Sequence, residues 1–182
     1  HLDRARRRYA QVTRRLQFDH QSVYELSAAD ATFDLTLCRH VLHSIPHADR
    51  VIAELVRVTK PGGYLHLIPE DYGMLHFQAG TLDPRDFWHA VPAQMSAATG
   101  TDLFCGRNAY TILSDLSLQN ITIDYVVVDA LRVPREIFAS ILEAWRDGYA
   151  EPIAETTELS EERAIAYFNQ MIADARNPRR YA

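Results

Sequence analysis

The sequence predicts an α/β fold in which helices flank a mostly parallel sheet and a helical extension follows at the C-terminal end. Short segments that are apolar on both faces alternate with segments of helical periodicity, which is typical of a parallel sheet covered by helices. Residues 121–128 alternate between apolar and wetter positions, which predicts an antiparallel edge strand. The sheet is therefore expected to be mixed.

The first half of the chain supplies the predicted core of strand, helix and strand. Residues 33–38 form a short apolar run, and residues 48–59 place a broad apolar face at helical spacing. Residues 60–63, with the sequence Lys-Pro-Gly-Gly, end this helix with a cation at its negative end and a turn. Residues 64–69 form the next strand. This order predicts two parallel strands joined by a helix.

Upstream of this core, residues 1–16 carry apolar side chains at helical spacing, so we expect an amphipathic helix with its arginines on the solvated side. Residues 16–20 form a candidate strand after it. The block of arginines is interpreted as a solvated helix face, because a charge block on one face of a helix is usually in contact with water.

Capping residues mark the helices downstream. Asp83 can cap a helix that Pro84 begins, and Pro92 is expected to kink or end its first part. A short helix is expected over residues 108–116. Two amphipathic helices, over residues 134–147 and 160–176, close the chain, and Ser160 is the expected N-cap of the second.

Length and composition fit one globular domain. The chain has 182 residues and a net charge of −5, so it offers no general attraction to nucleic acid or anionic lipid. Its two cysteines show no disulfide or metal-binding spacing, which favours a reducing compartment. We expect a cytoplasmic protein that acts on a small molecule, with no nucleic-acid or membrane partner. The oligomeric state stays open, with a homodimer as one candidate.

Ligands of open α/β sheets bind outside the carboxyl ends of the strands. Three loops take this place in the predicted fold, at residues 21–26, 39–47 and 70–76. The second and third loops are polar although they follow apolar strands. Their polar and aromatic side chains are Arg39, His40, His43, His47, Glu70, Asp71, Tyr72 and His76. This grouping predicts a ligand crevice at that edge of the sheet.

One stretch of the chain carries a family pattern. A strand opens with Phe33 and Asp34, and a loop, a helix, the sequence Lys-Pro-Gly-Gly and another strand follow. This stretch resembles the second half of a class I S-adenosylmethionine-dependent methyltransferase. The N-terminal helix resembles the one after the family's ribose-binding acidic residue, and residues 100–128 resemble its last helix and closing strand pair. The resemblance spans residues 1–130 and implies a Rossmann-like methyltransferase fold.

The resemblance also implies the cofactor S-adenosyl-L-methionine, which leaves as S-adenosyl-L-homocysteine, and a role for each matching residue. His43 lies near the transferable methyl group and is the expected catalytic residue. The expected cofactor-binding residues are Ser22 and Val23 at the adenine and Arg39, His40 and Leu42 along the methionine part. The expected substrate-binding residues, which would face the acceptor, are Glu70, Asp71, Tyr72 and His76.

No metal site is expected, although His40, His43 and His47 have a suggestive spacing. Pro46 interrupts any helix that would bring these three histidines to one face, and no carboxylate or cysteine completes a known set of ligands.

The sequence departs from the family because no glycine-rich loop precedes the matching part. We therefore expect residues 1–182 to form a single methyltransferase domain that is incomplete at its N-terminus. The strand at residues 33–38 should then lack a partner on one side. Residues 83–100 and 134–177 are helical additions, which we expect to cover the crevice and define the acceptor pocket.

Methyl transfer is an in-line displacement, so the main task of the protein is to hold the acceptor in line with the methyl group and sulfur. A protonated hydroxyl or amine also needs a base, and the ordinary pKa of histidine, about 6.5, suits His43 for this task. Two alternatives are open. The missing glycine loop and Ser22 favour a non-catalytic, methyltransferase-like binding domain. A nicotinamide-dependent oxidoreductase would share the sheet, but the Lys-Pro-Gly-Gly pattern disfavours it.

Overall fold

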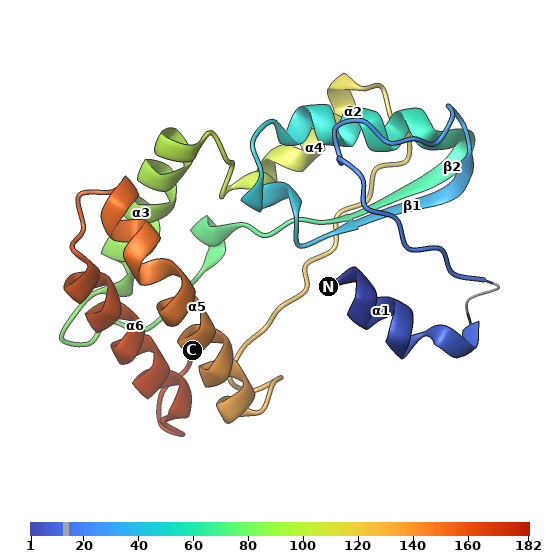
Figure 1. Ribbon diagram of the computed structural model, residues 1–182. Helices are drawn as coiled ribbons and strands as arrows, with labels where there is room; N and C mark the ends of the chain where they lie inside the picture. Colours follow the sequence, from blue (N-terminus) through green and yellow to red (C-terminus); the bar gives the residue numbers. More distant parts are fainter. Residues whose placement is uncertain (13–14) are drawn as a thin grey trace. The chain divides into compact units, whose positions relative to one another are not determined.

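The computed structural model describes residues 1–12 and 15–182, which form two compact units (Figure 1). Unit 1 comprises His1–Leu37 and Arg50–His66. Unit 2 comprises Cys38–Asp49 and Leu67–Ala182. Unit 1 contains most of the predicted core of strand, helix and strand, whereas unit 2 contains the strand-end loops and the long helices.

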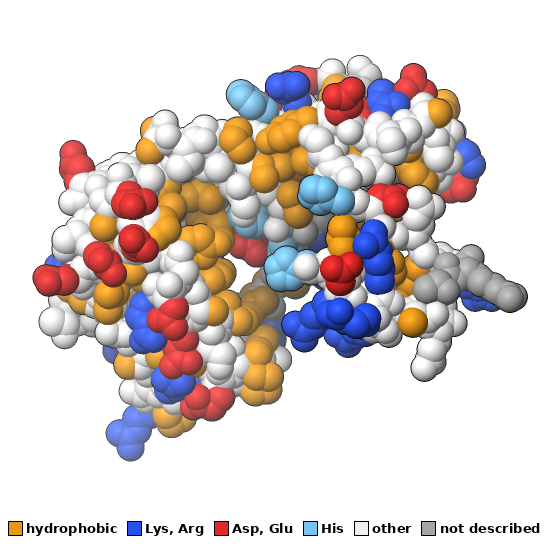
Figure 2. All heavy atoms as spheres, viewed as in Figure 1, with side chains coloured by type: hydrophobic (Ala, Val, Ile, Leu, Met, Phe, Trp, Pro, Cys, Tyr) orange, Lys and Arg blue, Asp and Glu red, His pale blue; other side chains and the backbone are white. Residues whose placement is uncertain are grey.

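The N-terminal helix α1 spans Leu2–Arg8 and is followed by a 3-10 turn, η1, at Ala10–Val12. The helix is shorter than predicted, and Thr13 and Arg14 lie outside the described residues. Figure 2 shows basic side chains gathered over α1, and no residue of α1 is buried, as expected for a solvated face.

The prediction of a strand at residues 16–20 is wrong. This segment is irregular and packs locally against α1 instead of pairing with another strand. The Arg6 guanidinium donates a hydrogen bond from Nη2 to the Phe18 carbonyl oxygen at 2.9 Å, and the Tyr9 and Phe18 rings stack at 6.2 Å. The Phe18 carbonyl thus bonds to a side chain, whereas a strand would require a ladder of backbone partners.

Strand β1 (Phe33–Arg39), helix α2 (Ala48–Val58) and strand β2 (Thr59–Ile68) confirm the predicted order. The backbone N–H of Ala31 donates to Arg57 O, and that of His40 donates to Ile68 O, each at 2.9 Å. The partner numbers rise together along both segments, so the strands are parallel. Figure 1 shows α2 alongside the two strands.

Helix α2 forms because its apolar residues recur on one face. Val51, Ile52, Leu55 and Val58 are all buried. The helix ends at Val58, and β2 begins at the next residue, before the predicted turn. Gly62 has a φ of 78° within β2, a left-handed conformation that glycine adopts without the cost of a Cβ.

In the described part of the chain, β1 has β2 as its one hydrogen-bonded neighbour. The prediction that this strand lacks a partner on one side is therefore confirmed. Its alternate side chains Phe33, Leu35 and Leu37 are 43%, 53% and 57% exposed, so one face of the strand is also uncovered. The apolar run predicts that this strand is buried on both faces. In the described residues it is not, because Phe33, Leu35 and Leu37 are exposed.

Unit 2 contains four long helices, which are α3 (Pro84–Thr99), α4 (Cys105–Asp115), α5 (Arg135–Thr156) and α6 (Glu161–Arg176). It also contains two 3-10 turns, η2 at Leu42–Ser44 and η3 at Tyr72–Met74. Helices α5 and α6 pack along each other. The expected caps are confirmed: Asp83 accepts a hydrogen bond from Arg85 N at 3.0 Å, and Ser160 accepts one from Arg163 N at 3.3 Å.

Two proline residues lie inside helices that continue past them. Pro92 does not end its helix, because α3 runs on to Thr99 with Pro92 buried in the packed interior of unit 2, so that part of the prediction is wrong. Helix α5 similarly includes Pro152 and extends beyond the predicted end at residue 147, since Ala150 and Ile153 continue its buried face. Burial of the proline ring and the following turn offsets the lost backbone hydrogen bond.

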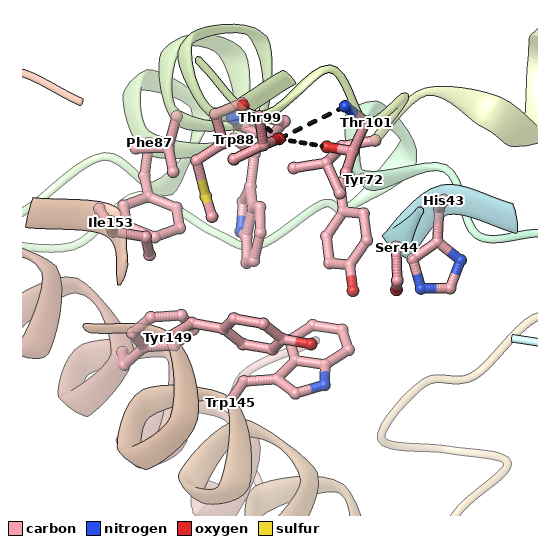
Figure 3. Close-up of a pocket in the computed structure, with 15 residues that line it drawn as sticks. His43, Ser44, Tyr72, Phe87, Trp88, Thr99, Thr101, Trp145, Tyr149 and Ile153 are labelled. Atoms are coloured by element: carbon pink, nitrogen blue, oxygen red, sulfur yellow. Dashed lines mark hydrogen bonds between the residues drawn. The ribbon is translucent and has the colours of Figure 1, made fainter. Parts of the chain in front are cut away.

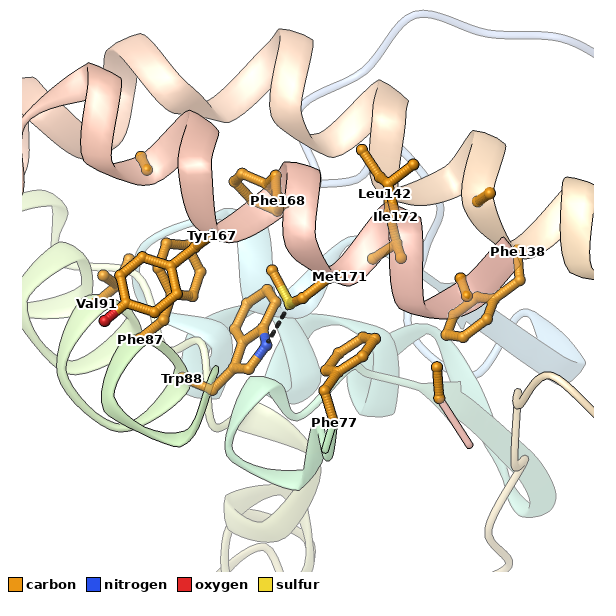
Figure 4. Packing of buried hydrophobic residues seen from close by; sticks show 14 of the residues in the cluster. Phe77, Phe87, Trp88, Val91, Phe138, Leu142, Tyr167, Phe168, Met171 and Ile172 are labelled. Atoms are coloured by element: carbon orange, nitrogen blue, oxygen red, sulfur yellow. Dashed lines mark hydrogen bonds between the residues drawn. The ribbon is translucent and has the colours of Figure 1, made fainter. Parts of the chain in front are cut away.

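The core of unit 2 is rich in aromatic side chains from α3, α5 and α6 (Figure 4). The ring centroid of Phe87 lies 4.8 Å from that of Trp88 and 5.3 Å from that of Phe168, in edge-to-face arrangements. The Trp88 indole N–H donates to the Met171 sulfur at 3.2 Å. These contacts fix the aromatic side chains that form the candidate site.

The prediction of an edge strand at residues 121–128 is wrong. The segment has no strand assignment, and Ile123, Tyr125 and Val126 are 57%, 71% and 80% exposed. Alternation shows that side chains suit a strand, but a strand also requires a neighbour to bond its backbone groups. Among the described residues, the sheet contains β1 and β2 and is parallel.

Candidate functional site

Unit 2 contains an apolar cavity of about 170 Å³. Its lining combines residues of the strand-end loops with residues of α3, α5 and α6. They are His43, Ser44, Tyr72, Phe87, Trp88, Val91, Pro92, Met95, Thr99, Thr101, Leu103, Trp145, Tyr149, Ile153 and Phe168. The helical additions therefore line a pocket together with the loops that follow β1 and β2.

Aromatic rings lie on two sides of the cavity (Figure 3). Tyr72, Phe87 and Trp88 lie on one side, and Trp145 and Tyr149 lie on the other. The Tyr72 ring centroid is 6.0 Å from that of Trp88 and 5.5 Å from that of Trp145, so Tyr72 contacts rings of both sides. The cavity thus offers a ligand aromatic contacts from two directions.

Glu70 is the centre of a polar cluster at one end of this cavity. Its Oε1 lies 2.8 Å from His40 Nδ1, and its Oε2 lies 3.6 Å from His43 Nε2. The Tyr72 ring lies beside this pair, with its centroid 5.7 Å from that of the His43 ring. The cluster joins the loop after β1 to the loop after β2, so the structure brings four sequence-predicted residues together: His40, His43, Glu70 and Tyr72.

His43 is held in one ring orientation by Glu70. The Glu70 backbone N–H donates to His43 Nδ1 at 3.3 Å, so we assign the proton of the neutral ring to Nε2, which faces the Glu70 carboxylate. Burial lowers the pKa of His43, the Glu70 carboxylate raises it and His40 lowers it, with a net decrease. The imidazole is therefore neutral near pH 7.

The hydroxyl of Tyr72 keeps its proton. Burial raises the pKa of Tyr72 well above its ordinary range, and the neighbouring Glu70 and Tyr149 raise it further. Tyr72 is therefore a neutral phenol that presents its ring to the cavity. The 3-10 turn η3, which begins at Tyr72, places this ring between the two loops and the helices.

Asp71 is engaged in local contacts. Its Oδ1 accepts hydrogen bonds from Gly73 N at 3.0 Å and Arg107 Nη2 at 2.8 Å. Its Oδ2 accepts from Arg107 N at 3.1 Å and Arg107 Nε at 2.7 Å. A Cβ at Gly106 would lie 2.8 Å from the Asp71 Cβ, so glycine permits this close approach. These contacts favour a positioning role for Asp71, which fixes the turn that carries Tyr72.

The other predicted site residues lie in different places. His76 is exposed and does not line the cavity. Leu42 is 1% exposed and belongs to the packed interior of unit 2, whereas Arg39 is exposed. Ser22 and Val23 belong to unit 1, where the Ser22 hydroxyl accepts a hydrogen bond from Tyr24 N at 3.3 Å.

The chain turns sharply at the carboxyl end of β1. His40 has a φ of 53°, which is uncommon for a residue with a side chain. Arg39 and His40 are exposed at this turn, so their side chains are open to a ligand.

The structure also allows two negative findings for the described residues. They contain no group of three or more histidine, cysteine, aspartate or glutamate side chains arranged to hold a metal ion. None of the helices described is long and apolar enough to cross a membrane.

Comparison with known proteins finds a family similarity for part of the chain. Residues 1–67 match the family model of a methyltransferase domain. The match confirms the resemblance to a methyltransferase domain over these residues, which make up less than half of the chain. The chain matches none of the curated proteins.

The family match covers only a small part of the cavity. It includes His43 and Ser44, whereas the other lining residues, from Tyr72 onward, lie beyond residue 67. Trp88, Trp145, Tyr149 and Phe168 lie on the helical additions that the sequence predicts to define the acceptor pocket, but none of the four was predicted individually as a lining residue. The spacing of Trp145, Tyr149 and Ile153 along one face of α5 was the available signal, and it also fits an ordinary buried helix face.

Proposed function

We propose that the protein is an S-adenosylmethionine-dependent methyltransferase that acts on a small organic molecule bound in the unit 2 cavity. One observation carries this proposal: residues of the methyltransferase-matching segment and of the helical additions line the same apolar cavity, beside a buried histidine and a carboxylate. The proposed protein acts in the cytoplasm on a small molecule, and it has no nucleic-acid or membrane partner.

The cofactor contributes an electrophilic methyl group on a positively charged sulfur. Arg39, His40 and the backbone at Leu42, which all belong to unit 2, would hold its methionine part. The apolar side chains of α3 and α5 would orient the acceptor and exclude water from it, which favours the in-line geometry that methyl transfer requires.

Glu70 and Tyr72 are the residues that would remove the acceptor's proton. Tyr72 lines the cavity, and the neighbouring Glu70 carboxylate raises the pKa of its hydroxyl. In the proposed relay, a proton released by the acceptor would pass to the Tyr72 oxygen while the Tyr72 proton passes to the Glu70 carboxylate. Both groups lie at the end of the cavity where the strand-end loops meet.

His43 would support this relay as a positioning residue. Both of its ring nitrogens contact Glu70, one at the backbone N–H and one at the carboxylate. This geometry favours a role in which His43 holds Glu70 in place, instead of the direct uptake of the proton expected from the sequence. Because the imidazole is neutral, it does not hold Glu70 in its charged form as a cation would, so Glu70 can accept the proton.

Thermal unfolding in the presence of ligands tests the proposed class. S-Adenosylhomocysteine should raise the midpoint of unfolding in a concentration-dependent manner, because a ligand that binds the native state stabilises it by mass action. NAD should leave the midpoint unchanged. Protection by NAD and not by S-adenosylhomocysteine would instead support an oxidoreductase, and protection by neither would support a domain that does not bind the cofactor.

A further inference from the structure

The cavity combines many aromatic rings with a local excess of negative charge. Six aromatic residues of η3, α3, α5 and α6 line it. They are Tyr72, Phe87, Trp88, Trp145, Tyr149 and Phe168. No lysine or arginine lines it. Glu70 does not itself line the cavity, but its Oε2 lies 3.6 Å from Nε2 of the lining residue His43.

Two arginines that stand close to lining residues in the chain are already paired with other side chains. Arg107 is held by Asp71, with 2.7 Å between Nε and Oδ2. Arg146, which follows the lining residue Trp145, contacts Asp147 at 2.9 Å and Asn169 at 2.8 Å. An anionic ligand would therefore meet no lysine or arginine among the lining residues, whereas a cationic ligand would meet aromatic faces and His43, whose Nε2 lies 3.6 Å from the Glu70 carboxylate.

From this arrangement we infer that the acceptor is an amine, which the cavity binds as an ammonium ion attached to an apolar group about the size of one ring. That the amine accepts a methyl group rests on the proposed function. That the cavity binds an ammonium ion rests on the cavity's lining alone. Aromatic faces attract an ammonium ion through their quadrupole, and this attraction grows when water is excluded.

The size of the cavity sets the size of the apolar group. Its volume is about 170 Å³. An engineered cavity of about 150 Å³ in another protein holds one benzene molecule, so a single six-membered ring with a short substituent fits here. Fused ring systems and long chains would have to extend out of it.

The polar cluster also suits the chemistry of an amine. An ammonium nitrogen has no lone pair to offer, so one of its N–H bonds must break before it can accept a methyl group. Its proton can move to the Tyr72 oxygen while the Tyr72 proton moves to Glu70, which leaves the amine neutral and the carboxyl group neutral. Charge is conserved, and the amine regains the lone pair.

Three small ligands of similar shape test the inference on the full chain. They are N,N-dimethylbenzylamine, which is a cation near pH 7, isobutylbenzene, which has the same shape without the charge, and phenylacetate, which is an anion. The chain has two tryptophans, Trp88 and Trp145, and both line the cavity, so the intrinsic tryptophan fluorescence reports binding directly. No cofactor is needed for this measurement.

We expect the amine to bind at least about tenfold more tightly than isobutylbenzene, and phenylacetate to bind most weakly. In the Glu70→Gln variant the preference for the amine should fall to less than about threefold, with isobutylbenzene affinity unchanged. Glu155→Gln is the matched control, because it removes the same charge from an exposed position of α5 that does not line the cavity, and it should preserve the full preference.

Equal or tighter binding of isobutylbenzene or phenylacetate would overturn the inference, and so would the absence of any fluorescence change with the amine. If Glu70→Gln does not fold, the ranking of the three ligands on the unaltered chain decides the matter. An amine that binds as expected but is never methylated would support this inference and count against the proposed function. Methylation of a neutral or anionic acceptor instead would do the reverse.

Discussion

Asp71 offers a sharp test of how the site is held together. We expect Asp71→Asn to lower the free energy of unfolding by about 2 kcal/mol, within the range of about 1.5–3 kcal/mol for hydrogen bonds to charged groups. The Asp71 side chain is 5% exposed and accepts four hydrogen bonds, three of them from Arg107. Asparagine keeps one acceptor oxygen and turns its amide group toward N–H donors.

Exposure limits this loss of stability. The Arg107 side chain is 53% exposed, so water replaces part of what the guanidinium loses. For a chain of this size, a loss of about 2 kcal/mol corresponds to a fall of about 4–8 °C in the midpoint of thermal unfolding. Urea unfolding followed by tryptophan fluorescence and by circular dichroism measures the effect, and the two signals test whether the transition is two-state.

A double-mutant cycle isolates the contact between the two side chains. Asp71→Asn, Arg107→Met and the double variant should give a coupling free energy of about 1–2 kcal/mol, because each single change removes the same pair. The reasoning fails if Asp71→Asn unfolds within about 0.5 kcal/mol of the parent while its affinity for ligands falls more than tenfold. That result would return Asp71 to the substrate-binding role expected from the sequence.

Three further predictions concern the helices and the buried histidine. Ser160→Ala should cost about 1 kcal/mol in urea unfolding, since it removes the N-cap of α6, and a loss below about 0.3 kcal/mol would contradict this. Phe168→Ala should cost about 3–5 kcal/mol, because that ring is 1% exposed, and a loss near 1 kcal/mol would indicate a site that collapses. Burial lowers the pKa of His43 in the folded state, so the unfolded chain takes up this proton first, and stability should fall as the pH drops below about 6.5 and stay level above it. His43→Gln should flatten that fall in unfolding experiments between pH 7 and 5, and an unchanged slope would argue against a buried neutral imidazole.

The core of strand, helix and strand was predictable because its signals are local and agree with one another. The apolar residues of α2 recur on one face, and all four of Val51, Ile52, Leu55 and Val58 are buried. The segment at 121–128 shows the limit of such reasoning. Its alternation suits a strand, but hydrogen bonding depends on a neighbour that the segment itself does not encode.

The candidate site divides in the same way. The polar strand-end loops were predictable because the carboxyl ends of parallel strands meet at one edge, and the structure brings His40, His43 and Glu70 together there. The aromatic cavity was not predictable, because Trp88 and Trp145 stand far apart in the sequence. An aromatic residue on an apolar helix face has the same pattern whether it fills a core or lines a pocket.

Transfer of a labelled methyl group tests the central claim most directly. The full chain is incubated with S-adenosylmethionine labelled in its methyl group and with N-methylbenzylamine, a ring-sized secondary amine, and the organic product is counted. Our account predicts label in N,N-dimethylbenzylamine, with a loss of at least tenfold in the Glu70→Gln variant and none in Glu155→Gln. Label that never leaves the cofactor, with this amine or with a hydroxyl or carboxylate acceptor of the same size, would contradict it.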